Sequence, residues 1–219
     1  MAYTSSLDKS AGKFSEMMLT NGFGIVTVMN AKIYDALPAD ELKTKTAYEI
    51  VEGATNALVT LDTLKIANVT IEGPTKTVTG GQYSNPLIKF GKTARLEMQD
   101  ALGNANAIEY LCGGIMEMEE SALAGLHFGE DFMGPKMIIG DTFFIDRKSG
   151  RQVPVKIVFY QFLPDSIFNL TQDAEGDATV FDMNGDLLTT EILVGDVAGN
   201  PVKHGVFYSI VDGSEKVSQ

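Results

Sequence analysis

The sequence has no tryptophan, a single cysteine and only two histidines. The lone Cys112 excludes a disulfide within the chain and fits a protein that is made and kept in a reducing compartment. Because it follows an apolar stretch in "AIEYLCGG", we expect it to be a small core residue rather than a nucleophile. His127 and His204 stand far apart, with no paired metal ligands nearby, and belong to no catalytic pattern.

Long apolar runs and the common catalytic motifs are also absent. The longest uncharged run before Lys32 has 15 residues and is broken by Asn and Gly, too short and too polar to cross a bilayer. The N-terminus "MAYTSSLDKSAGK" does not resemble a targeting signal. No G-x-S-x-G, P-loop or H-E-x-x-H pattern occurs, and "GFG" at 22–24 lacks the third glycine of a dinucleotide fingerprint. We therefore expect no enzymatic activity, no cofactor and no membrane contact.

Positive charge is scarce in the second half of the chain. Residues 1–110 hold 10 Lys and Arg against 12 Asp and Glu, a net of −2, whereas residues 111–219 hold 7 against 17, a net of −10. Specific or tight binding of nucleic acid depends on neutralising phosphates with Lys and Arg. The composition therefore argues against a protein that binds DNA or RNA tightly. An excess of acidic residues by itself is explained by solubility.

One acidic stretch, "NLTQDAEGDATVFDMNGDLL" at 169–188, carries five carboxylates within fourteen residues: Asp173, Glu175, Asp177, Asp182 and Asp186. An EF-hand loop requires Gly at its sixth position and Glu at its twelfth. Counted from Asp173 these positions are Ala178 and Asn184, so the loop does not fit. A calcium site of another kind, a catalytic pair and a charged surface remain as alternatives.

The spacing of apolar residues predicts a mainly β fold. Strands are expected at 23–29, 61–73, 86–90, 92–99, 136–146 and 151–164, with further short strands after 166, and "DRKSGR" suits a hairpin turn. One helix is expected at about 98–112, ended by Gly113-Gly114, with Leu102, Ile108 and Leu111 on its buried face. Many short strands with one helix indicate a β-sandwich or β-barrel-like fold flanked by that helix.

Two segments carry no clear pattern. "PADELKTK" at 38–45 is compatible with a helix start, but an exposed loop or hairpin over about 30–55 fits equally well. We expect that loop or hairpin, and the N-terminal arm, to be mobile in the monomer.

No Pro- or Gly-rich linker divides the chain, so residues 1–219 are expected to form a single domain.

Three segments resemble the major tail tube protein of tailed bacteriophages. They are "ANVTIEGPTKTVTGGQYSNPLIKFGKTARLEMQDALG", then "AIEYLCGG", then "VPVKIVFYQFLPDSIFNLTQDAEGDATVFDMNGDLL". The hairpin around "AEGD" in the third segment is the most specific feature. Together the segments cover residues 67–113 and 153–188.

The resemblance implies a structural virion protein, made in the host cytoplasm, whose hexameric rings stack into a tail tube. DNA would pass through the channel without specific binding, and the other partners would be tail proteins such as the tape measure, the terminator and the baseplate or sheath. On this basis we expect a net negative channel, with the acids of residues 165–191 contributing. The alternatives are a tube or baseplate component of a contractile injection machine, a carbohydrate-binding β-module, and a metal-dependent enzyme.

Overall fold

The structure is a computed structural model that describes residues 23–25, 30–62, 64–73, 75–77, 87–89, 91–100, 105–120, 122–129, 133–147, 150, 152–165, 181–197 and 200–213. In these residues the protein is mainly β, as predicted, and all pairs of named strands are antiparallel. The helices are α2 Ala39–Leu42, α3 Ala47–Gly53 and α4 Ala105–Cys112. The strands are β1 Phe23–Ile25, β2 Asn30–Asp35, β3 Val59–Leu61, β4 Leu64–Glu72, β5 Thr75–Thr77, β6 Leu87–Lys89, β7 Thr93–Asp100, β8 Gly114–Glu119, β9 Ala122–Phe128, β10 Lys136–Asp146, β11 Gln152–Pro164, β12 Phe181–Leu187, β13 Thr190–Val197, β14 Asn200–Val206 and β15 Tyr208–Asp212.

A long hairpin, β10–β11, forms the centre of a nine-stranded sheet with the order β3-β2-β10-β11-β12-β7-β4. The turn of this hairpin includes Gly150, whose positive φ of 68° suits a residue without Cβ. Strands β1 and β15 complete the sheet by pairing with the other halves of β10 and β11. The predicted strands at 136–146 and 151–164 and their turn are therefore confirmed.

The main core lies on one face of the sheet. Val59 on β3 and Leu96 on β7 belong to one buried cluster, although five strand spacings separate these strands in the sheet order. A continuous layer of buried side chains therefore runs across the sheet from β3 to β7. Helix α4 packs on this face and adds Ile108 and Leu111 to the same cluster.

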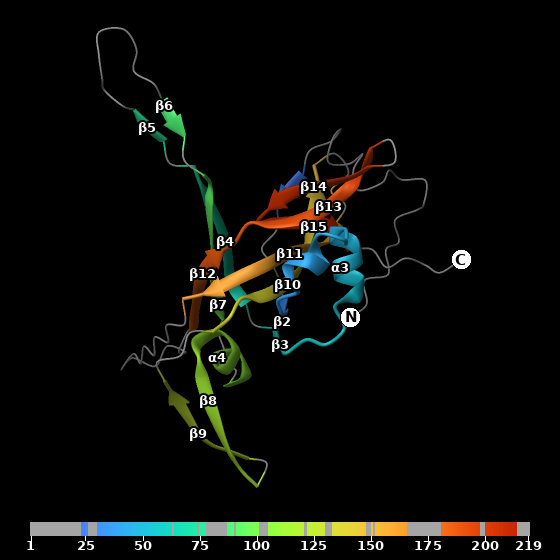
Figure 1. The fold of residues 1–219 in the computed structure, drawn as a ribbon. Coiled ribbons are helices and arrows are strands. Elements are labelled where there is room, and N and C mark those ends of the chain that lie inside the picture. The colour runs from blue at the N-terminus through green and yellow to red at the C-terminus, as the bar shows by residue number, and fades with distance from the viewer. Residues whose placement is uncertain are drawn as a thin grey trace.

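The other face of the central strands is also covered. Met137, Ile139, Val158 and Tyr160 point to this face because neighbouring residues of a strand alternate between the two sides. Helices α2 and α3 cover them with Leu42 and Ile50, and β13 adds Ile192. The expectation of a single flanking helix is therefore wrong, since helices lie on both faces (Figure 1).

The expected loop or hairpin over about 30–55 is also wrong. This segment is strand β2 followed by α2 and α3. Thr46 accepts a hydrogen bond from the backbone N–H of Glu49, whose carboxylate accepts one from the N–H of Thr46, so the two form a capping box at the start of α3. Burial of Leu42 and Ile50 holds both helices against the sheet. The expected N-terminal arm lies outside the described residues.

The predicted helix at 98–112 begins too early. Residues 98–100 continue strand β7, where Met98 pairs with Met183 of β12 on one side and with Ala67 of β4 on the other. This pairing on both edges overrides the helical spacing of the local sequence. The described helix is α4, in which Ile108 and Leu111 are buried, and Leu102 lies outside the described residues.

Two arms extend from this body in opposite directions (Figure 1). One is the continuation of β4 and β7, with the short pair β5–β6 above it. The other is the β8–β9 hairpin, which follows directly after α4 and was not predicted. The alternating "IMEME" of β8 is the signal that sequence reasoning missed.

Candidate functional site

The outer face of strands β12, β7 and β4 is a polar surface, because β12 and β7 alternate between buried and outward residues and β4 continues their register. On β7, Ala94, Leu96 and Met98 are at most 4 % exposed and face the core. Arg95, Glu97 and Gln99 lie between them and therefore face outward. We call this outward surface the polar face.

Neighbouring strands continue the polar face in register. On β12, Met183 and Leu187 are buried, whereas Asp182 and Asp186 are exposed. Asp182 lies opposite Gln99, and Asp186 lies opposite Arg95. On β4 the outward residues are exposed: Asn68 opposite Glu97, Thr70 opposite Arg95, and Glu72 opposite Thr93.

Negative charge dominates the polar face. Its described side chains include five carboxylates and one guanidinium, a net charge of −4: Glu72, Glu97, Asp165, Asp182 and Asp186 against Arg95. These groups are spread over three strands rather than gathered around one point. The described residues contain no group of three or more His, Cys, Asp or Glu side chains arranged to hold a metal ion.

Arg95 is the one cation among the described side chains of the polar face and contacts two of its carboxylates. It forms an ion pair with Asp165, the residue directly after β11, and its Nη1 lies 3.3 Å from Oδ1 of Asp186. The hydrogen bond to Asp165, more than any other contact, raises the pKa of Arg95 above its ordinary value. Gln99 donates a hydrogen bond of 3.0 Å to Asp182. These contacts order the side chains of the face without neutralising it.

A glycine allows β11 and β12 to lie close together beneath this surface. A Cβ atom at Gly185 would overlap the carbonyl oxygen of Leu163 and would lie 2.7 Å from the ring of Phe162. Gly185 pairs with Pro164, the last residue of β11. The pairing of the polar strands with the central hairpin therefore depends on this position.

Strand edges flank the polar face on both sides. Strand β4 ends the sheet order, and its outer edge has no partner strand among the described residues. On the other side, β11 pairs with β12 only over Leu187 to Gly185, and residues 181–183 extend past it. An edge strand presents unpaired backbone N–H and C=O groups that can pair with another chain.

The structure places two of the five predicted acids on the polar face, Asp182 and Asp186. Asp173, Glu175 and Asp177 lie outside the described residues. Sequence reasoning missed Glu72, Arg95 and Glu97, which come from other parts of the chain, whereas Asp165 lies within the predicted acidic range 165–191. The alternation of "TARLEMQD" in β7 was a signal for Arg95 and Glu97, but only the strand pairing shows that they share a face with Asp182.

The cysteine and the histidines form no site in the described part of the chain. Cys112 is buried against the core, and burial raises the pKa of its thiol to about 11, so it is a poor nucleophile. His127 is exposed on β9, where its Nε2 lies 2.8 Å from Glu117. His204 is exposed on β14, in a different hairpin.

No protein-family model matches the chain, and no curated protein matches it. None of the described helices is long and apolar enough to cross a membrane. In the described part of the chain, the fold and the site define a mainly β protein whose sheet has one acidic, exposed face bordered by strand edges.

Proposed function

We propose that this protein is the subunit of a phage tail tube, a structural virion protein whose rings stack around a channel for DNA. The observation that carries the proposal is the polar face of β12, β7 and β4. Among the described residues, this face is acidic and solvent-exposed, its reverse side is the hydrophobic core, and its outer strand edges have no partner strand. The resemblance of residues 67–113 and 153–188 to tail tube proteins supports the same assignment.

The strand edges supply a physical route to a ring. When the edge of β4 in one subunit pairs with an edge strand of the next, the unpaired backbone groups of both are satisfied. Repetition around an axis closes the sheets into one barrel that has no edges. The polar face then lines the inside of the barrel, and the cores of the subunits form its wall.

The charge of the polar face suits a channel for DNA. A wall rich in Lys and Arg would bind the phosphates and hold the duplex in place. Carboxylates repel the duplex from every side, and the low-dielectric wall of the protein focuses their field within the channel. A net charge of −4 from the described residues of each subunit is multiplied by the number of subunits in a ring.

Electron microscopy of the purified protein in negative stain tests the proposal. Rings or tubes with a central hole are the expected result over a series of increasing concentrations. A uniform monomer at the highest concentration would overturn the proposal. Rings that carry additional density over the hole, or that never stack, would favour a baseplate component over a tube subunit.

A further inference from the structure

The β8–β9 hairpin extends away from the main sheet and pairs with no third strand among the described residues (Figure 1). An isolated two-stranded ribbon is at best marginally stable in water. At its base the hairpin contacts α4, where a Cβ atom at Gly114 would lie 3.3 Å from Ile108. Its outer part has no such support from the described body of the protein.

The two faces of this hairpin differ in character. On one face, Nε2 of His127 lies 2.8 Å from the carboxylate of Glu117, and Glu119 follows on the same side. The other face is apolar, because Met116 lies opposite Leu126 and Met118 lies opposite Leu123. We call the surface of these four residues the apolar face of the hairpin.

The apolar face is covered at its base and uncovered toward its tip. Leu126 packs against the main core, and Met116 is half-buried. Farther out, Met118 is 56 % exposed and Leu123 is 49 % exposed. Contiguous exposed apolar residues with a polar border are typical of surfaces that contact another protein.

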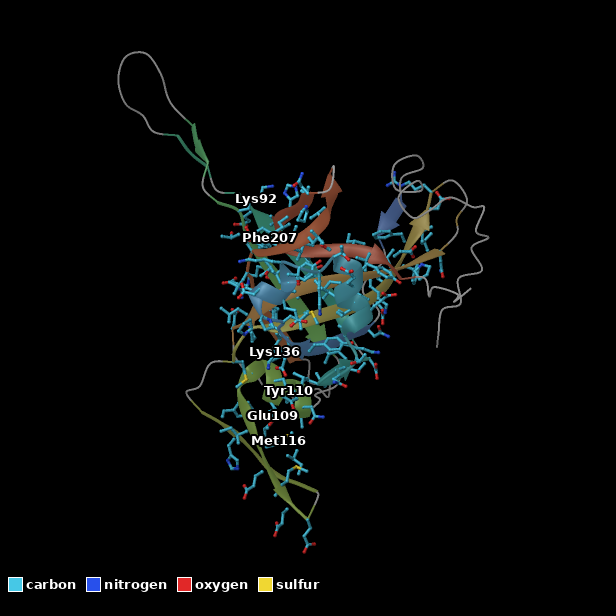
Figure 2. The ribbon with its side chains drawn as sticks, turned by 45° about the vertical axis from the view of Figure 1, so that its right-hand side comes forward. Lys92, Glu109, Tyr110, Met116, Lys136 and Phe207 are labelled. Carbon is cyan, nitrogen blue, oxygen red and sulfur yellow. The ribbon has the colours of Figure 1, made fainter. Side chains whose placement is uncertain are left out.

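The two arms of the molecule differ in the sign of their charge. Residues 114–131 contain five acidic residues and no Lys or Arg, whereas residues 73–92 contain three Lys and no acidic residue. Of these residues, Glu117 and Glu119 lie on β8, whereas Lys76 lies on β5 and Lys89 on β6, and the two pairs of strands extend in opposite directions in Figure 1. In Figure 2, Lys92 is labelled on the upper part of the body, where the basic arm begins, and Met116 is labelled on the hairpin below the body.

From the apolar face and this separation of charge, we infer that the β8–β9 hairpin docks on a second copy of this chain, at the end that carries the basic arm. Opposite charges at the two ends favour a head-to-tail arrangement and disfavour contact between like ends. A head-to-tail contact uses two different surfaces, so each bound copy leaves one free for the next. The inference rests on the proposed function in one respect: in a tail tube, this contact would join the subunits of successive rings along the tube axis.

Two variants of equal exposure test the apolar face. Met118 and Ile115 are each 56 % exposed, but they lie on opposite faces of the hairpin. Met118→Lys is expected to raise the concentration required for assembly by about tenfold, a typical effect of removing an apolar anchor from an interface. Ile115→Lys is expected to assemble like the wild type. Sedimentation velocity over a concentration series measures both, and thermal melting of the dilute monomers shows that both fold.

A charge exchange tests the position of the partner. Glu119→Lys and Lys92→Glu are each expected to weaken assembly, and the protein that carries both changes is expected to recover much of it. Recovery requires that the hairpin of one copy approach the basic arm of another. If the double variant is no better than the two single ones, the inference about this contact is overturned.

The outcomes separate this inference from the proposed function. If Met118→Lys assembles into tubes as readily as the wild type, the hairpin contact is wrong and the tube proposal stands. If Met118→Lys instead lowers the melting temperature of the monomer and leaves assembly unchanged, the apolar face is covered by the same chain, and the contact is again wrong. Wild-type stacks without a central hole, weakened by Met118→Lys, would support the contact and overturn the tube. A wild-type protein that remains monomeric would overturn both.

Discussion

Gly185 of β12 lies so close to Leu163 of β11 that no side chain fits between them, because a Cβ atom there would overlap the Leu163 carbonyl oxygen. Gly185→Ala must therefore push the two strands apart or displace the ring of Phe162. Overpacking of this kind costs on the order of 1–3 kcal/mol. Urea unfolding of the monomer measures the loss. Gly53→Ala is the control, since a Cβ atom at Gly53 meets nothing within 4 Å, and an effect of similar size there would contradict the role of close packing.

The capping box of α3 predicts a dependence of stability on pH. Thr46→Ala removes the hydroxyl that accepts the Glu49 N–H, and the loss is expected to be about 1 kcal/mol at neutral pH. Hydrogen bonds from Thr46 hold the pKa of Glu49 below its ordinary value of 4.5. A carboxylate with a lowered pKa contributes stability above its ordinary pKa, and that contribution is lost as the pH falls through the lowered value. The destabilisation of Thr46→Ala should therefore shrink below about pH 4.5, as thermal melts at several pH values would show. A difference that stays constant to pH 2 would contradict this coupling.

Helix α4 offers a pair of neighbouring positions with different burial. Leu111 is 1 % exposed within the main core, whereas Glu109 is only half-buried. Leu111→Ala is expected to lower the free energy of unfolding by about 2–5 kcal/mol because it leaves a cavity. Glu109→Ala is expected to change it by less than about 0.5 kcal/mol. Denaturant unfolding of both variants tests the orientation of the helix, which equal losses would contradict.

The sequence predicted those parts of the fold whose signals are local. The β10–β11 hairpin combines apolar, β-branched runs with a Ser-Gly turn, so its pattern and its pairing agree. Residues 98–100 were assigned to a helix because nothing local shows that Met98 has strand partners on both sides. Helices α2 and α3 were ambiguous because only two of their residues, Leu42 and Ile50, are fully buried, although Thr46 and Glu49 have the spacing of a capping box.

The same distinction applies to the candidate site. The acidic stretch at 169–188 is visible in the sequence, and two of its acids lie on the polar face. Glu97 and Asp165 join them through strand pairing and an ion pair over long sequence distances, which single-sequence reasoning does not provide. The alternation of each strand shows which side faces the core, but which outward residues share a face depends on the strand pairing of the whole sheet.

The charge of the polar face gives the last prediction, which rests on the proposed function. Asp182 and Glu97 are exposed on adjacent strands, and neither pairs with Arg95 in the structure. Changing both to Lys moves the charge of the described side chains of this face by four units per subunit, from −4 to 0, and places cations where they would meet phosphates. Because each phosphate contact adds to the retention of DNA, ejection from virions built with this variant should slow by about tenfold or more.

Asp40→Lys is the control, since Asp40 is exposed on α2, which packs on the other side of the central strands. Tails of normal length that eject DNA at the normal rate with Asp182→Lys and Glu97→Lys would contradict an electrostatic role for these carboxylates. Equal slowing by Asp40→Lys would also contradict it, because the effect would then follow the total charge of the subunit rather than the charge that faces the channel.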